Sequence, residues 1–168
     1  MTGDAAAFTR LFEAHYDAVL RYGRRRTDEQ TARDVAAETF LVAWRRGVPD
    51  GDPLPWLYGV ARNCLANATR ATRREASALP RLATAPATPD LADAASDAET
   101  VRAALARLPD RDREAVLLVT WEDLPTRDAA RVAGCSPAAF AVRLHRARRR
   151  LAALLAEAPA RPLERETS

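Results

Sequence analysis

The sequence predicts an all-α fold of two small helical domains joined by a flexible linker. Apolar residues make up 48% of the 168 residues but aromatic residues only 6%, which favours small helical domains over a thick β-sandwich core. Apolar residues recur at three- and four-residue steps in both halves, the period of a helix face. Between the halves, 77–98 is proline-rich with little to bury and predicts the linker. We therefore expect domains at 1–76 and 99–158 and a tail at 159–168.

The first domain should contain three helices, with a loop before the third. In chain order the expected elements are a helix at 8–25, a helix at 27–46, a loop at 47–55 and a helix from Trp56 onward. The three prolines and two glycines of the loop cannot continue a helix. The second helix is expected to begin with a capping box, because Thr27 is followed three positions on by Gln30.

The second domain should contain a helix-turn-helix unit. Its helices are expected to be capped at the N-terminus by polar side chains, in order Asp110, Thr126 and Ser136. Gly134 predicts a left-handed stop after a short helix, and Pro137 suits the first position of the last helix. A short helix, a tight turn containing glycine and a longer basic helix form the helix-turn-helix layout.

Arginine abundance alone is weak evidence for nucleic-acid binding in this chain. All 26 basic residues are arginine and none is lysine, a bias that a GC-rich genome explains. The placement of the arginines is more informative, because acidic residues are absent from 56–74 and from 136–155. These two stretches are the candidate phosphate-facing surfaces.

Several classes of function are disfavoured by what the sequence lacks. Cys64 and Cys135 lie far apart with no ligand pair at zinc spacing, so we expect no metal, no disulfide and a reduced cytoplasmic setting. The N-terminus has no signal-peptide pattern, and no apolar run is long enough to cross a membrane. Asp34 and Glu38 share a helix side, but no nucleophile or second acidic pair accompanies them, so no enzyme and no cofactor is expected.

The last helix divides into an apolar face and a basic face. The apolar face, which should pack on the rest of the domain, consists of Phe140, Leu144, Ala147, Leu151 and Leu154. Arg143, Arg146 and Arg150 follow at helical spacing and predict an exposed stripe, and the adjoining strips carry His145, Arg148 and Arg149. A helix in the major groove of DNA needs this division. A solvated arginine face is the alternative, but the cap, the short helix and the glycine turn favour DNA binding.

The stretch 56–74 combines aromatic residues, asparagines and arginines. Asn63 and Asn67 share a helix face, and an asparagine side chain offers both a donor and an acceptor to a base edge. Trp56 and Tyr58 suit stacking on unpaired bases. From the residues alone, an equal alternative is that the aromatic residues belong to the core and the asparagines are surface residues.

Four segments in this order resemble the extracytoplasmic-function (ECF) group of bacterial sigma-70 family RNA polymerase sigma factors. They are "DVAAETFLVAWR", "PWLYGVARN", "LPDRDREAVLL" and "GCSPAAFAVRLHRARRRL". The resemblance covers 8–74, which matches sigma region 2, and 101–155, which matches region 4. It implies a cytoplasmic promoter-specificity subunit that binds core RNA polymerase through the β′ clamp helices and the β flap. It also makes an anti-sigma factor a candidate partner.

For the first domain, the resemblance implies one surface for polymerase and one for the −10 promoter element. The expected contacts with core polymerase are Asp34, Glu38, Leu41 and Arg45. Ala37 stands where the family usually has glutamine. The expected −10 contacts are Asp52 for a flipped base, Trp56 for stacking, Asn63 and Asn67 for base edges, and Arg62, Arg70, Arg73 and Arg74 for phosphates.

For the second domain, the resemblance implies that the last helix recognises the −35 element. The expected base-facing residues are Ala141, Val142, His145 and Arg146, and the expected phosphate contacts are Arg143, Arg148, Arg149 and Arg150, with Ser136 at the helix start. Alanine and valine can contact a thymine methyl group, so His145 and Arg146 should supply most polar contacts with bases. Asp123 stands where the family usually has glycine.

Two alternatives remain besides a sigma factor. A free-standing helix-turn-helix regulator would have a similar second domain but would need no DNA-melting helix, so "PWLYGVARN" disfavours it. A protein–protein adaptor whose arginines merely reflect composition would show no salt-dependent DNA binding, even with polymerase present.

Overall fold

The computed structural model describes residues 5–78 and 97–157, which form seven helices and no strand. The helices are α1 (Ala5–Arg24), α2 (Glu29–Arg46), α3 (Leu54–Ala78), α4 (Asp97–Arg107), α5 (Asp110–Thr120), α6 (Thr126–Ala133) and α7 (Pro137–Ala156). The all-α prediction is confirmed. Helices α3 and α4 extend slightly into the predicted linker, and its remainder and the predicted tail lie outside the described residues.

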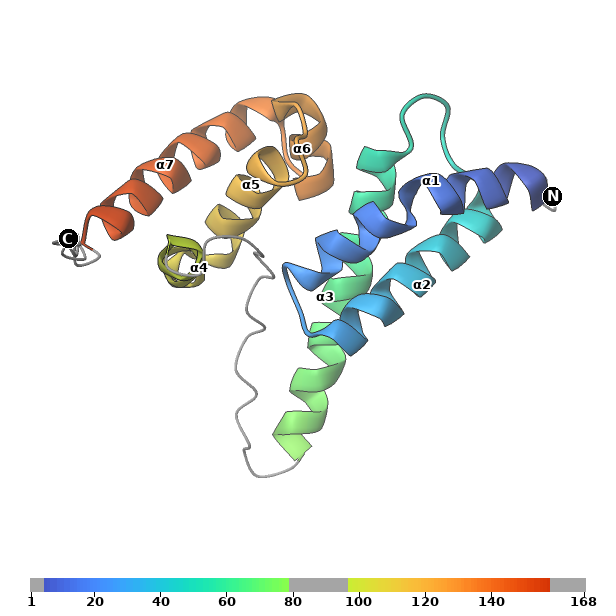
Figure 1. Cartoon of the computed structure of the whole chain (residues 1–168), viewed down its shortest axis with the longest axis horizontal. Helices are drawn as coiled ribbons and strands as arrows, with labels where there is room; N and C mark the ends of the chain where they lie inside the picture. The colour runs from blue at the N-terminus through green and yellow to red at the C-terminus, as the bar shows by residue number, and fades with distance from the viewer. Residues whose placement is uncertain (1–4, 79–96, 158–168) are drawn as a thin grey trace, which may run out of the picture.

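The first three helices pack into one unit around a continuous core (Figure 1). The core side chains at its centre, all at most 2% exposed, are Val19, Tyr22, Phe40 and Leu57. Helices α1 and α2 approach closely where Gly23 faces Ala32: a Cβ added at Gly23 would lie 3.1 Å from the Ala32 Cβ. This close packing fixes α2 against α1, with one face of α2 buried and the other exposed.

Helices α4 to α7 form the second unit, in which α6 and α7 make a helix-turn-helix. Gly134 ends α6 in the left-handed region, with φ 68° and ψ 39°, as predicted. The Ser136 hydroxyl accepts a hydrogen bond from the Ala139 backbone N–H at 3.2 Å, and Pro137 is the first residue of α7. Phe140, Leu144 and Ala147 are buried, as their spacing predicts.

Three of the predicted helix caps are wrong. The N-cap of α2 is Asp28, whose carboxylate accepts bonds from the Thr31 backbone N–H and hydroxyl at 2.9 and 2.7 Å. These bonds lower the pKa of Asp28. Thr27 lies one residue before the cap, and its backbone N–H bonds to the Gly23 carbonyl near the end of α1.

Asp110 and Thr126 are not caps but the first residues of α5 and α6. The extended backbone before each helix belongs to a proline, Pro109 and Pro125, neither of which makes a side-chain capping bond. Proline's fixed φ suits that position. Asp110 therefore acts through its charge at the positive end of the helix dipole.

Asp123 adopts φ 51° in the turn between α5 and α6. It is the one non-glycine residue with positive φ in the described part of the chain. Left-handed backbone is unfavourable for most side chains, although aspartate tolerates it better than others.

We expect Asp123→Ala to lower the free energy of unfolding by about 1 kcal/mol, because alanine has no polar side chain to support left-handed backbone. Asp123→Gly should stay within about 0.5 kcal/mol of the parent chain, since relief of strain is offset by glycine's greater freedom when unfolded. Urea unfolding followed by circular dichroism measures both. Equal losses in the two variants would contradict a backbone origin.

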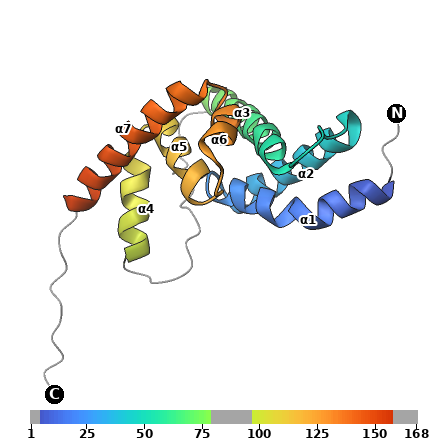
Figure 2. The ribbon, with the colours of Figure 1, turned by 90° about the horizontal axis from the view of Figure 1, so that it is seen from above.

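The two units contact each other where α3 packs on α6. Figure 2 shows α3 crossing beside α6, with α7 extending away from the first unit. The start of α1 and the end of α7 lie at opposite ends of the molecule in both views (Figure 1, Figure 2). The contact between the units joins α3, which carries most of the predicted −10 residues, to α6, the first helix of the helix-turn-helix.

Candidate nucleic-acid interface

The outer face of α7 presents most of the residues predicted to contact the −35 element. Ala141, Val142, His145, Arg148 and Arg149 are all exposed. Val142 is 67% exposed, which is unusual for a large apolar side chain and suits an apolar contact with a thymine methyl group. This face carries no acidic residue.

Arg146 and Arg150, in contrast, are not free on the surface but are anchored to Asp112 of α5. The Arg146 Nη2 donates to Asp112 Oδ1 at 3.2 Å, and the Arg150 Nη1 donates to Asp112 Oδ2. The two arginine side chains remain 54% and 48% exposed, whereas that of Asp112 is 2% exposed. Sequence reasoning missed Asp112, because no spacing pattern connects residue 112 with residues on another helix.

Two other residues predicted for the −35 surface have local roles. Arg143 is partly buried, with its Nη1 3.8 Å from the Cys135 Sγ. It lines the cleft between the units. Of the predicted exposed stripe, Arg146 and Arg150 are exposed, and Arg143 is half-buried. Ser136 is occupied by capping α7. This bond sets where α7 begins.

Helix α3 exposes part of the predicted −10 surface. Asn63, Asn67, Arg70 and Arg74 are exposed, and the Arg70 Nη2 donates a hydrogen bond to the side-chain Oδ1 of Asn67 at 2.5 Å. Trp56 is partly buried against the core, and Tyr58 is buried within it, stacked on Tyr22 at 5.0 Å between ring centroids. The core interpretation of the aromatic residues therefore holds for Tyr58.

Asp52 lies in the exposed loop before α3. Its Oδ1 accepts a hydrogen bond from the Leu54 backbone N–H at 3.0 Å, which satisfies a free amide at the start of α3. In this structure the carboxylate thus orders the loop. Elsewhere in the core, burial raises the pKa of the Tyr58 hydroxyl to about 12, so this hydroxyl stays protonated.

Helix α2 presents the predicted polymerase-binding residues on one exposed face. The four are Asp34, Glu38, Leu41 and Arg45. Leu41 is 38% exposed, and together with Phe12 and Val142 it makes up the large exposed apolar residues of the described chain. Gln30 donates a hydrogen bond to Asp34 at 3.1 Å. A single exposed leucine is common on protein surfaces, so the assignment of this face to polymerase stays a prediction.

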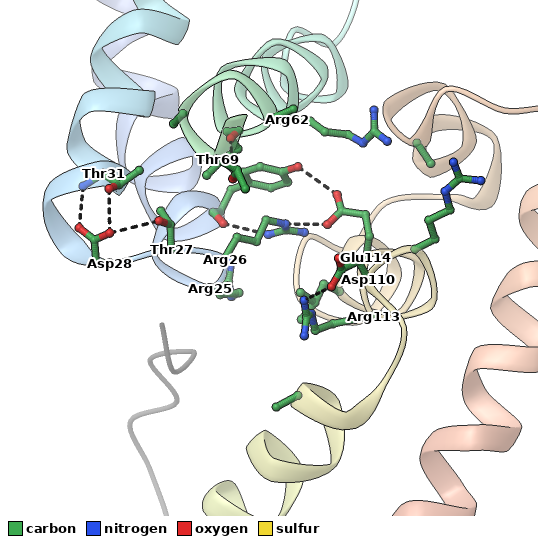
Figure 3. A pocket seen from close by; sticks show the side chains of 18 of the residues that line it. Arg25, Arg26, Thr27, Asp28, Thr31, Arg62, Thr69, Asp110, Arg113 and Glu114 are labelled. Carbon is green, nitrogen blue, oxygen red and sulfur yellow. Dashed lines mark hydrogen bonds and ion pairs between the residues drawn. The ribbon is translucent and has the colours of Figure 1, made fainter. Parts of the chain in front are cut away.

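The two units are joined by a buried ion cluster that no sequence pattern predicted. Arg26 donates to Glu114 at 2.8 Å and to Glu122 at 2.9 Å, while Arg25 donates to Glu122 at 2.8 Å. The Tyr22 hydroxyl donates to Glu114 at 3.0 Å, and the Arg26 guanidinium lies 3.6 Å from the centroid of the Tyr22 ring. Figure 3 shows Arg26 and Glu114 facing each other across the interface.

The charge state of this cluster follows from its burial. Burial alone would lower the pKa of Arg26, but Glu114, Tyr22 and Glu122 outweigh that effect and raise it. Burial also raises the pKa of Tyr22 well above its usual value, so its hydroxyl stays protonated and donates. The Glu122 side chain is only 1% exposed, and the Arg26 Nη2 is buried without a hydrogen-bond partner. The charged groups of the cluster are therefore paired, but the Nη2 of Arg26 still lacks a hydrogen-bond acceptor.

A cleft of about 1110 Å³ lies beside the ion cluster, with walls from both units. Its lining includes Arg62 and Arg73 of α3 and Arg143 of α7, and Figure 3 shows Arg62 on the far side of the cleft from Arg113. The cleft thus brings together arginines predicted for the −10 phosphates and one predicted for the −35 phosphates. Arg148 and Arg149 do not line this cleft and lie on the exposed face of α7.

Residues 5–78 and 97–157 contain no cluster of three histidine, cysteine or acidic side chains placed to hold a metal ion. None of the helices described is both long and apolar enough to span a membrane.

Comparisons with known proteins agree with this layout. Residues 11–75 match the family model for Sigma-70 region 2, and residues 98–151 match that for Sigma-70, region 4. A solved structure of the sigma factor RpoE in complex with the anti-sigma factor NepR from Bartonella quintana has the same fold. Its TM-score is 0.75 at 23% identity, with 91% of this chain and 99% of that chain covered.

The chain is also similar in sequence to known sigma factors. The ECF RNA polymerase sigma factor EcfG of Rhodopseudomonas palustris is 35% identical over 132 residues, which cover 74% of this chain and 71% of the relative. The probable RNA polymerase sigma factor RfaY of Xanthomonas campestris is 36% identical over 132 residues, 72% of this chain but 33% of that relative's length. With both sigma regions present in order, the chain belongs to the ECF group of sigma-70 family factors, which direct RNA polymerase to promoters.

Proposed function

We propose that α7 recognises the −35 element, that α3 and the loop before it recognise and open the −10 element, and that α2 binds the β′ clamp helices. The observation that carries this proposal is the outer face of α7. It is exposed and free of acidic residues, it carries Val142 in open solvent, and it follows a glycine turn and a serine cap. Those are the features that a major-groove helix needs.

The closed arrangement of the two units does not fit simultaneous binding of both promoter elements. Positions −10 and −35 are separated by about 25 base pairs, or about 85 Å of duplex at 3.4 Å per base pair. Arg62 and Arg143 instead line one cleft. We infer that the units separate when the chain binds core polymerase, and that the closed form is the state of the free chain.

The chain would act in the cytoplasm as a subunit without enzymatic activity of its own, because polymerisation belongs to the core enzyme. An anti-sigma factor is a further proposed partner, supported by the complex of the relative RpoE with NepR. An acidic segment entering the arginine-lined cleft would fit its charge.

Transcription with purified core polymerase tests this proposal. Promoters are first selected from a randomised DNA library with reconstituted holoenzyme, and initiation is then measured on a selected template. The holoenzyme should initiate, while core polymerase alone and the chain alone should not. If the chain does not bind core polymerase, the proposal is wrong. If the chain alone binds operator DNA tightly, it is a free-standing regulator instead.

A further inference from the structure

Asp112 is a buried acidic residue whose two oxygens are both directed at the recognition helix. It lies in the first turn of α5, and only 1% of the residue is exposed. A buried carboxylate is costly unless it is paired and hydrogen-bonded. Its partners, Arg146 and Arg150, lie one turn apart on α7. The carboxylate of α5 therefore links two successive turns of α7.

The geometry leaves the arginines able to bind DNA. Arg146 gives one Nη2 donor to Asp112, and its side chain is still 54% exposed. A guanidinium has five N–H donors in a rigid planar fork. Once Nη2 is fixed by Asp112, the orientation of the whole plane is restricted, and the remaining donors are presented in one direction.

A fixed guanidinium discriminates between bases better than a mobile one. Bidentate recognition of guanine requires two donors aligned with O6 and N7. A free arginine side chain loses much rotamer freedom on making that contact, whereas an arginine that is already held loses less. The same reasoning applies to Arg150 and a phosphate, but a phosphate contact carries no sequence information.

We propose that Asp112 is a positioning residue for −35 recognition, which holds Arg146 in the orientation that contacts a base and Arg150 in the orientation that contacts the backbone. This inference rests on the proposed function of α7. Asp112 itself touches no DNA and acts only through these two arginines.

The test is promoter selection with holoenzyme that carries Asp112→Asn, which removes the charge and one acceptor oxygen. Asp110→Asn is the matched control, since Asp110 has the same charge in the same turn but is exposed and pairs with Arg113. At the −35 position whose preference depends on Arg146, Asp112→Asn should reduce base discrimination about fivefold to tenfold, within the range of one bidentate contact. At the other −35 positions the preference should change less than about twofold, and the control should behave like the parent chain.

Two further variants separate positioning from folding. Asp112→Leu replaces the carboxylate with an apolar side chain of similar shape, keeps α5 packed, and should show the same loss at the same position. In the double variant Asp112→Asn with Arg146→Ala, the first change should have no added effect at that position. Uniform weakening at every position, or full additivity in the double variant, would overturn the positioning role.

The outcomes also distinguish this inference from the proposed function. If the parent holoenzyme selects a −35 sequence and Asp112→Asn leaves its base preference intact, only the positioning role is wrong. If the parent holoenzyme selects no −35 sequence at all, the proposed function of α7 is wrong, and the inference fails with it.

Discussion

Arg26→Ala should separate the two helical units and lower the free energy of unfolding by about 3–5 kcal/mol, the usual cost of removing one partner from a buried ion pair. Arg26 bonds to both Glu114 and Glu122, and its side chain is only 10% exposed. Without it, Glu114 and Glu122 lose a shared cation in an environment where carboxylates need one. The interface should open because the two unpaired carboxylates become hydrated when the units separate.

Small-angle X-ray scattering of the free chain should show a larger radius of gyration for Arg26→Ala, and urea unfolding should show the loss of stability. Arg33→Ala is the matched control, because Arg33 pairs with Glu29 on the surface, where both side chains are about half exposed. Such a pair contributes at most about 1 kcal/mol, and the radius of gyration should not change. An unchanged radius and stability in Arg26→Ala would show that the ion cluster does not hold the units together.

Arg146→Ala and Arg149→Ala should weaken transcription in different ways. Loss of a bidentate base contact by Arg146 should reduce discrimination at one −35 position by about 1–3 kcal/mol, or about fivefold to 150-fold. Arg149 is exposed on the outer face of α7 and is predicted to contact a phosphate. Its loss should weaken binding to all promoters alike and make binding less sensitive to salt.

Initiation by reconstituted holoenzyme is measured on templates that carry each base at each −35 position, at two salt concentrations. Arg107→Ala serves as a control, because Arg107 is an exposed arginine of α4 that pairs with Glu157 at the far end of α7. If Arg146→Ala lowers initiation equally on every template, Arg146 contacts the backbone and another residue reads the base.

Much of the fold was predictable because it depends on local pattern. The left-handed stop at Gly134 and the cap at Ser136 were predicted from residue type alone, since few residues suit those positions. The buried face of α7 followed from helical spacing. The cap of α2 was harder, because Thr27 and Asp28 are both good caps and the choice depends on where α1 ends.

The contacts that organise the candidate site were not predictable in the same way. Asp112 meets Arg146 and Arg150 from 34 and 38 positions away, and Arg26 meets Glu114 from 88 positions away. Periodicity describes one helix at a time, so it identifies exposed arginines but not the acidic residues that face them. This is why the exposure of Arg146 and Arg150 was predicted, whereas their pairing with Asp112 and the partial burial of Arg143 were not.

The pairing of Arg146 and Arg150 with Asp112 also affects how promoter binding responds to ions. Helix α7 carries five arginines and no acidic residue, which suggests up to five displaced counterions per bound helix. Asp112 already neutralises one of these charges inside the protein. Because the logarithm of the binding constant falls by about 0.9 per neutralised phosphate for each tenfold rise in salt, the second unit should show a shallower slope than its arginine count implies. A promoter-binding protein with such a built-in counterion keeps more of its affinity when the ionic strength of the cell rises.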